Sequence, residues 1–324
     1  MIAVETDHLP VLLEETIDGL DVRPGGIYVD CTLGLGGHSE RIVQLLGPSG
    51  TLIAIDRDKD SLEIARQRIQ PLHPHCSFHH ENFKNLPLIL RNLQIQQIDG
   101  CLIDLGVSRR QLTIPERGFS FREEGPLDMR MDQSQQTTAE LLVNRLPQEE
   151  LARIFKEYGE EPQHRKVAGA IVAARQKERI RTTAQLADVV AQAKGKSRRK
   201  GIHPATQVFQ ALRIEVNQEL EGLDRFLERV IDFLAPDGRL AAISFHSLED
   251  RITKKTFQRE AGRCICFRPG AMCTCPRVER VEILTRKPIT PSDAELLHNP
   301  SARSAKLRIV KRLNPVSTSG RGGA

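Results

Sequence analysis

The sequence contains no apolar run long enough to cross a membrane, so it does not predict an integral membrane protein. Residues 1–10 also lack the basic start and apolar stretch of a secretory signal peptide. Seven cysteines, an odd number in a chain with no secretion signal, favour a reducing cytoplasm over a disulfide-bonded exterior. A strong excess of either charge is absent, and the net charge of +5 is compatible with a nucleic-acid partner without establishing one. At 324 residues, the chain can bury one large core or two domains.

A glycine is also missing from the most informative stretch of the chain, Ile27–Ser39 (IYVDCTLGLGGHS). An apolar run ending at Asp30 leads into a glycine loop, and helical spacing begins at His38, which predicts a strand, a loop and a helix around a cofactor. A dinucleotide fingerprint needs a third glycine at position 39, where the chain has serine. Taken alone, such a loop is also compatible with a plain tight turn. The loop glycines predicted to approach the cofactor are Gly34, Gly36 and Gly37.

Two acidic residues select between the cofactors that such a loop can bind. Asp30 precedes the glycines, where a carboxylate would repel a pyrophosphate but can reach the ammonium of S-adenosylmethionine. A second apolar run ends at Asp56, twenty residues after Gly36, where a carboxylate suits a ribose diol. The pattern therefore favours S-adenosylmethionine as the cofactor.

Further strands are expected at Cys76–His80 and Ile98–Asp104, and with the intervening helices they predict an α/β fold with a doubly wound, Rossmann-like sheet. Phe83 follows the first of these strands and is placed to cover an adenine, with core packing as the alternative. Asp104 ends the second strand, where it could face a target amine and the donor methyl group. Its alternative role is that of a helix cap or turn residue.

The alternation of strands and helices stops after Val107. Residues 109–132 are rich in charge, proline and glycine, which indicates a long loop over a site rather than part of a core. Helical patterning without a clear strand follows over residues 137–193. We therefore expect an inserted all-helical domain, with these boundaries: the sheet domain over 1–112 and 205–312, the insertion over 113–204, and a disordered tail over 313–324.

A basic segment closes the predicted insertion. Such a glycine-containing loop suits phosphate contacts with RNA, although a solvated linker would have a similar composition. The residues predicted to contact RNA are Lys196, Arg198, Arg199 and Lys200.

After the insertion, the spacing predicts one amphipathic helix over 209–235 and a fifth strand over 239–245. The strand leads into a dense polar cluster, HSLEDR, which core packing does not require, so His246 and Glu249 are candidate site residues. Residues 264–275 contain two CxC pairs, whose four thiolates could close a zinc site or remain reduced on a loop. The cysteines of this candidate are Cys264, Cys266, Cys273 and Cys275.

Several motifs together resemble the bacterial 16S ribosomal RNA (cytosine-N4)-methyltransferase H family. They are HLPVLLEE, DCTLGLGGHS, AIDRD, DLGVS, RGFSF, GPLDMRMD, SFHSLEDR and NPSARSAKLR, and they run from His8 to about Arg312. The resemblance implies S-adenosylmethionine as methyl donor and the N4 amine of one cytidine near the decoding centre as acceptor. It also implies a helical substrate domain inserted in a methyltransferase sheet, with 16S ribosomal RNA or the assembled small subunit as partner and neither DNA nor a membrane.

The resemblance also implies a set of cofactor contacts, of which His38 and Gln111 come from the resemblance alone. The full set is Gly36, Gly37, His38, Asp56, Phe83, Asp104 and Gln111. The chain departs from the family pattern DLGVSSPQLD, because Arg109 and Arg110 replace a small polar residue and a proline before Gln111.

The expected mechanism is direct methyl transfer, in which Asp104 and the cluster from His246 to Glu249 orient a poorly nucleophilic amine. Two alternatives remain open at this point. A DNA amino-methyltransferase usually carries an (Asp/Asn/Ser)-Pro-Pro-(Tyr/Phe) motif, and this chain has Asp104-Leu105-Gly106-Val107 instead. A ribosome assembly factor could use the same loops to bind RNA and cofactor without required turnover.

Overall fold

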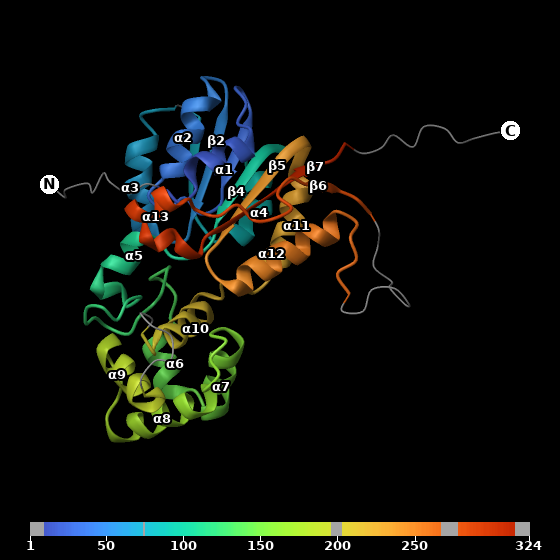
Figure 1. Ribbon diagram of the computed structural model, residues 1–324. Coiled ribbons are helices and arrows are strands. Elements are labelled where there is room, and N and C mark those ends of the chain that lie inside the picture. The colour runs from blue at the N-terminus through green and yellow to red at the C-terminus, as the bar shows by residue number, and fades with distance from the viewer. Residues whose placement is uncertain (1–9, 74, 196–202, 267–277, 315–324) are drawn as a thin grey trace. The chain divides into compact units, whose positions relative to one another are not determined.

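The computed structural model describes residues 10–73, 75–195, 203–266 and 278–314, and it divides the chain into two compact units (Figure 1). The sheet unit comprises Met1–Gly106 and Gly222–Ala324. The helical unit comprises Val107–Glu221. None of the helices in the described part of the chain combines the length and the hydropathy of a membrane span.

The sheet unit is built on seven strands in the spatial order β3-β2-β1-β4-β5-β7-β6. The first five in this order run parallel, β7 pairs antiparallel with β5, and β6 pairs antiparallel with β7. The strand bounds are β1 Ile27–Asp30, β2 Thr51–Asp56, β3 Cys76–His80, β4 Ile98–Asp104, β5 Leu234–Ser244, β6 Val281–Ile283 and β7 Lys306–Arg312. The parallel order reverses at β1 and β4, so the carboxyl ends of these strands define the edge where a ligand binds.

Helices cover both faces of the sheet (Figure 1). One apolar cluster joins the sheet to α1 (Leu13–Leu20), α2 (Gly37–Leu46) and α3 (Lys59–Ile69). A second cluster, on the other face, joins it to α4 (Leu86–Asn92), α11 (Leu223–Phe233) and α12 (Ser247–Glu260). Successive residues of a strand point to opposite faces, so the continuous apolar runs of β2 and β4 supply both clusters. The sheet unit also contains α13 (Asp293–His298) and the short 3₁₀ helices η1 (Phe83–Asn85) and η3 (Pro300–Ser304).

The helical unit has a core of its own, and the helical pattern predicted over residues 137–193 is confirmed. Its elements are α5 (Arg109–Thr113), η2 (Pro115–Arg117), α6 (Ala139–Arg145), α7 (Gln148–Glu157), α8 (His164–Lys177), α9 (Thr183–Lys194) and α10 (Thr206–Asn217). The stretch 109–132 is less loop-like than predicted. Leu127, Met129 and Met131 are buried in this core, and the buried Arg117 donates hydrogen bonds to the carbonyls of Arg130 and Met131.

The single helix predicted over 209–235 is wrong, because the chain breaks it into α10 and α11. Gln218 and Gly222 adopt left-handed backbone conformations between them, with φ of 49° and 66°. α10 packs into the helical core through Phe209 and Leu212, so the helical unit is wider than the predicted 113–204. Asn217, at the end of α10, is fully buried: its Oδ1 accepts a hydrogen bond from Met131 N and its Nδ2 donates one to Met129 O.

Candidate functional site

The loop between β1 and α2 forms the centre of the candidate site. Gly34 and Gly36 both adopt left-handed conformations, with φ of 52° and 81°, and Gly36 is the residue that precedes α2. A Cβ on Gly36 would lie 2.6 Å from Ile69 Cδ1 of α3, so the side of Gly36 without a side chain faces protein, not ligand. A Cβ on Gly34 would have only one neighbour within 4 Å, the Thr32 carbonyl at that limit. The loop requires glycine at Gly36, as predicted, but the reason is that a side chain there would clash with α3.

Two carboxylates fasten this loop to the strand ends. Asp30 accepts hydrogen bonds from Ser39 Oγ at 2.7 Å and from Thr32 N at 3.1 Å. Asp56 accepts from Gly34 N at 2.6 Å and from Asp58 N at 2.7 Å. Asp30 is 1 % exposed, so its observed contacts are with the loop itself, and its contact with the methionine ammonium stays a prediction. Ser39, which replaces the third glycine of a dinucleotide loop, thus holds the carboxylate that shapes this one.

Asp104 ends β4 beside the same loop. Its backbone N–H donates to Thr32 Oγ1 at 2.6 Å, and its side chain is 24 % exposed. Its Oδ2 lies 3.9 Å from Nδ1 of the buried His38, while His38 Nε2 is bonded to the Val11 carbonyl at 3.0 Å. Asp104 Oδ1 is buried and has no hydrogen-bond partner within the described part of the chain. A buried carboxylate oxygen without a partner is costly, which makes it a candidate acceptor for a ligand.

The cluster after β5 lies at the neighbouring strand end, because β5 pairs with β4. Glu249 is 1 % exposed, and its Oε2 accepts from Phe245 N at 2.8 Å and from His246 N at 3.2 Å. Its Oε1 lies 3.1 Å from His246 Nε2. The structure therefore brings two of the predicted residues together, with Glu249 holding the turn that presents His246.

Three carboxyls at this edge have raised pKa values. Burial raises the pKa of Asp30 and that of Asp56 to about 6 each, against the opposing effect of their hydrogen bonds. Burial raises the pKa of Asp104 well above its usual range, and the negative charges of Asp30 and Glu249 raise it further. Burial and mutual repulsion both disfavour the ionised forms, and a bound cation would reverse this. The edge is therefore suited to a positively charged ligand.

Two further predicted contacts lie in other settings. Phe83 is 9 % exposed and packs against Phe226 of α11 with ring centroids 4.6 Å apart, so core packing accounts for most of its surface. Gln111 belongs to the helical unit, where its backbone N–H and side-chain oxygen form a capping box with Ser108. Their predicted cofactor contacts stay predictions.

The predicted RNA contacts and the cysteine cluster are not tested by the described residues. Lys196, Arg198, Arg199 and Lys200 lie outside them, as do Cys273 and Cys275. Cys264 and Cys266 are described and exposed.

The sequence did not predict a pair of salt bridges next to the cluster after β5. Asp250 accepts hydrogen bonds from Arg308 Nε at 2.7 Å and from Lys306 Nζ at 3.1 Å, which ties the start of α12 to β7. The pKa of Asp250 is lowered, because these two cations outweigh the effect of its burial. The motifs SFHSLEDR and NPSARSAKLR contain these three residues, but nothing local in either motif predicts the pairing.

The fold and the site together define a Rossmann-like methyltransferase. Five parallel strands are followed by β7 and β6, which join through antiparallel pairs; a glycine loop follows β1, and an acidic residue ends each of β1, β2 and β4. The chain belongs to the MraW methylase family, which matches residues 5–313. The cofactor of this class is S-adenosylmethionine, and the residues at the sheet edge fit it. Its ammonium and sulfonium groups are positively charged, and a positive charge at this edge would stabilise the ionised forms of the three carboxyls, whose pKa values are raised.

Curated relatives support the assignment over nearly the whole chain. A protein of Halothermothrix orenii named ribosomal RNA small subunit methyltransferase H is 47 % identical over 95 % of this chain and 99 % of its own length. A protein of the same name from Nitratidesulfovibrio vulgaris is 48 % identical over 95 % of this chain and 86 % of its own. Among solved structures, a methyltransferase homologue from Pyrococcus horikoshii aligns with a TM-score of 0.42 at 12 % identity, over 94 % of this chain and 68 % of that one.

The raised pKa values predict that cofactor affinity depends on pH. If cofactor binding requires both Asp30 and Asp56 to be ionised, we expect protons to be released on binding and the affinity to be about a hundredfold weaker at pH 5 than at pH 7.5. Calorimetry in buffers of different ionisation enthalpy measures both quantities. A pH-independent affinity with no proton release would contradict this reading.

The stability of the ligand-free fold provides the control, because these two carboxyls make it fall as the pH rises, whereas the cofactor affinity is expected to rise. Both carboxyls have folded-state pKa values above the ordinary 3.8. Their contribution to stability is therefore full at low pH and declines as the pH rises through about 6. Unfolding caused by these two groups thus cannot explain weaker binding at pH 5.

Proposed function

We propose that the chain transfers the methyl group of S-adenosylmethionine to the N4 amine of a cytidine in small-subunit ribosomal RNA, near the decoding centre. The observation that carries the proposal is Asp104, a largely buried carboxyl beside the glycine loop whose Oδ1 has no hydrogen-bond partner in the described residues. The names of the curated relatives support ribosomal RNA of the small subunit as the substrate. The cytoplasm, where that RNA is found, is the proposed location.

The chemistry requires orientation more than a strong base. The cofactor supplies a methyl group on a sulfonium, which is already activated for displacement. The lone pair of the cytosine amine is conjugated with the ring, so the protein has to hold the amine in line with that methyl group. Asp104 Oδ1 accepts a hydrogen bond from the amine and fixes its direction.

A carboxylate in this position also stabilises the transition state. Positive charge develops on the amine as the methyl group is transferred, and a fixed negative charge in a water-poor site favours that change. Glu249 accepts hydrogen bonds from Phe245 N and His246 N and so fixes the turn that carries His246 at the neighbouring strand end. A fixed turn at this place limits the orientations that the target cytosine can adopt. The target cytidine has to leave its stack to reach Asp104, as in other enzymes that modify a base.

A deletion strain tests the proposed function. Small-subunit ribosomal RNA from cells that lack the gene is digested to nucleosides and analysed by mass spectrometry. We expect N4-methylcytidine to be lost and to return when the wild-type gene is restored. An unchanged nucleoside composition would contradict the proposal.

The same strain separates the enzyme from a cofactor-binding assembly factor. If turnover is the function, Asp104→Asn restores neither N4-methylcytidine nor any phenotype that depends on it. A variant without turnover that fully restores ribosome function would favour the assembly factor.

A further inference from the structure

The first turn of α8 carries positive charge where helices normally carry negative charge. His164, Arg165 and Lys166 occupy this turn, and it contains no acidic residue. The N-terminus of a helix is the positive end of its dipole, so acidic side chains stabilise it and basic ones do not. The residue before the helix, Gln163, makes no capping hydrogen bond with its side chain. Local stability therefore does not explain this choice of residues.

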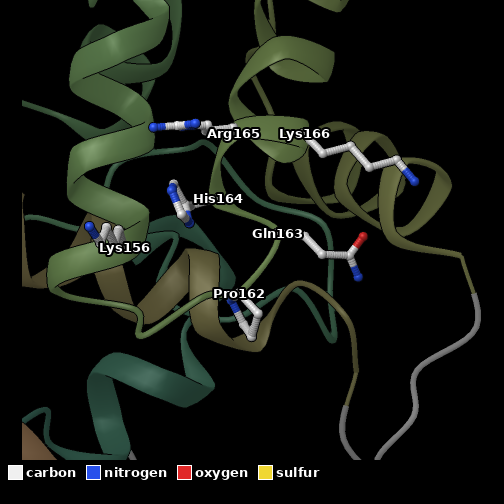
Figure 2. A pocket seen from close by; sticks show the side chains of 6 residues that line it. All are labelled: Lys156, Pro162, Gln163, His164, Arg165 and Lys166. Carbon is white, nitrogen blue, oxygen red and sulfur yellow. The ribbon is translucent and has the colours of Figure 1, made fainter.

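These basic residues surround a hollow at the surface of the helical unit (Figure 2). Lys156, near the end of α7, and the connecting residues Pro162 and Gln163 complete its lining. Its volume is about 350 Å³, within the range of pockets that hold small organic groups. A group of nucleotide size therefore fits a hollow bordered by four basic side chains.

The charge of this hollow is not neutralised by the protein. Lys156, Arg165 and Lys166 are exposed, and none forms an ion pair with a carboxylate of the described residues. The acidic residues nearest in sequence have other partners. Glu157 pairs with Arg153, and the buried Glu161 pairs with Lys194 and accepts a hydrogen bond from Gln163 N. These two carboxylates are thus paired with cations other than the three exposed ones that border the hollow.

Figure 2 shows how the cations are distributed: Arg165 and Lys166 extend in opposite directions from the start of α8, and His164 lies between Lys156 and Gln163. A single small anion would be held by side chains that converge on one point. Diverging cations on both sides of a hollow suit a chain of anionic groups that passes across it.

We propose that this hollow binds the phosphodiester backbone of RNA, with Lys156, Arg165 and Lys166 each close to a phosphate. The site would be sequence-independent, because cations that contact phosphates position a nucleic acid without reading its bases. The inference rests on the proposed function, which makes an RNA the substrate. It adds three residues of the helical unit to the RNA contacts that the sequence predicts.

Two triple variants of the full chain test the site. Each removes three positive charges from exposed side chains of the helical unit, and only one set borders the hollow. The test variant combines Lys156→Gln, Arg165→Gln and Lys166→Gln. The matched control combines Arg145→Gln, Lys177→Gln and Arg181→Gln. Thermal unfolding of both verifies that the fold is kept.

The readout is the binding of a small-subunit ribosomal RNA transcript as a function of salt concentration. Each lost phosphate contact reduces the magnitude of the slope of log K against log salt by about 0.7 for single strands, so we expect the test variant, which loses three contacts, to reduce it by about 2. We also expect roughly tenfold weaker binding near 150 mM salt, with a smaller change in the control. With small subunits as substrate, KM rises and turnover at saturation is kept.

Three results would overturn the inference. The first is equal loss of affinity and equal slopes for the two triple variants. The second is displacement of RNA from the wild type by inorganic phosphate beyond the effect of sodium chloride at equal ionic strength, which indicates a single-anion site. The third is displacement of RNA from the wild type by polyglutamate as effectively as by unlabelled RNA, which indicates an acidic protein as the partner.

The failure of this inference is distinguishable from the failure of the proposed function. If the wild type produces N4-methylcytidine and the two triple variants bind RNA alike, only the hollow is misassigned. If the slope changes as expected but no methylated nucleoside is produced, the hollow binds RNA and the proposed reaction is wrong.

Discussion

Asparagine in place of Asp104 is expected to lower the rate of methyl transfer by roughly 10²–10³-fold, the usual effect of removing one group that stabilises developing charge. The amide has nearly the same shape as the carboxyl, so the loop after β1 and the hydrogen bond from Asp104 N to Thr32 should be kept. The amide cannot ionise, however, so it offers no negative charge to the amine as that group becomes positive. The loss should therefore appear in turnover, not in folding.

Single-turnover kinetics with saturating S-adenosylmethionine and small subunits separate this effect from weaker binding. Asp224→Asn is the matched control, because Asp224 is an exposed carboxylate of α11 in the same unit. Retention of most of the turnover by Asp104→Asn would remove Asp104 from the mechanism.

Alanine in place of Gly36 should weaken cofactor binding by about 10–100-fold, through two costs that act together. A residue with a Cβ pays about 1–3 kcal/mol for a left-handed conformation such as the φ of 81° found here. The new Cβ would also lie 2.6 Å from Ile69 Cδ1 and 3.1 Å from Ala65 Cβ, so the loop has to move away from α3. Movement of this loop disturbs the bond from Gly34 N to Asp56.

The two costs can be separated by controls. Gly222→Ala has the same conformational cost at a φ of 66°, with no atom within 4 Å of the new Cβ. It should lower stability and leave cofactor affinity unchanged. Adding Ile69→Val to Gly36→Ala removes the closest atom and should restore part of the affinity, measured by calorimetry. If Gly36→Ala binds the cofactor as tightly as the wild type, the loop does not form the site.

The centre of the site could be predicted because its signals are local. A buried strand, an acidic residue and a glycine loop follow one another within Ile27–Ser39, and Asp56 and Asp104 repeat the pattern of a strand with an acidic end. Parallel strands bring such ends to one edge. The sequence could not show that Asp30 and Asp56 bond to the loop, because that depends on how Ser39 and Gly34 are oriented.

The features that were missed depend on contacts between distant parts of the chain. β7 pairs with β5, some sixty residues away along the chain, and its Lys306 and Arg308 find their partner in Asp250 only through that pairing. The break between α10 and α11 interrupts a spacing that continues smoothly in the sequence. Asn217 looks like a surface residue there, although it is buried against the backbone of Met129 and Met131.

The most direct measurement uses purified protein, methyl-labelled S-adenosylmethionine and small ribosomal subunits from cells that lack the enzyme. After digestion to nucleosides, we predict label in N4-methylcytidine with the wild type and almost none with Asp104→Asn. Label in a different nucleoside would contradict the proposed acceptor. Cofactor binding without label in any nucleoside would contradict the claim that this sheet edge is a methyl-transfer site for small-subunit RNA.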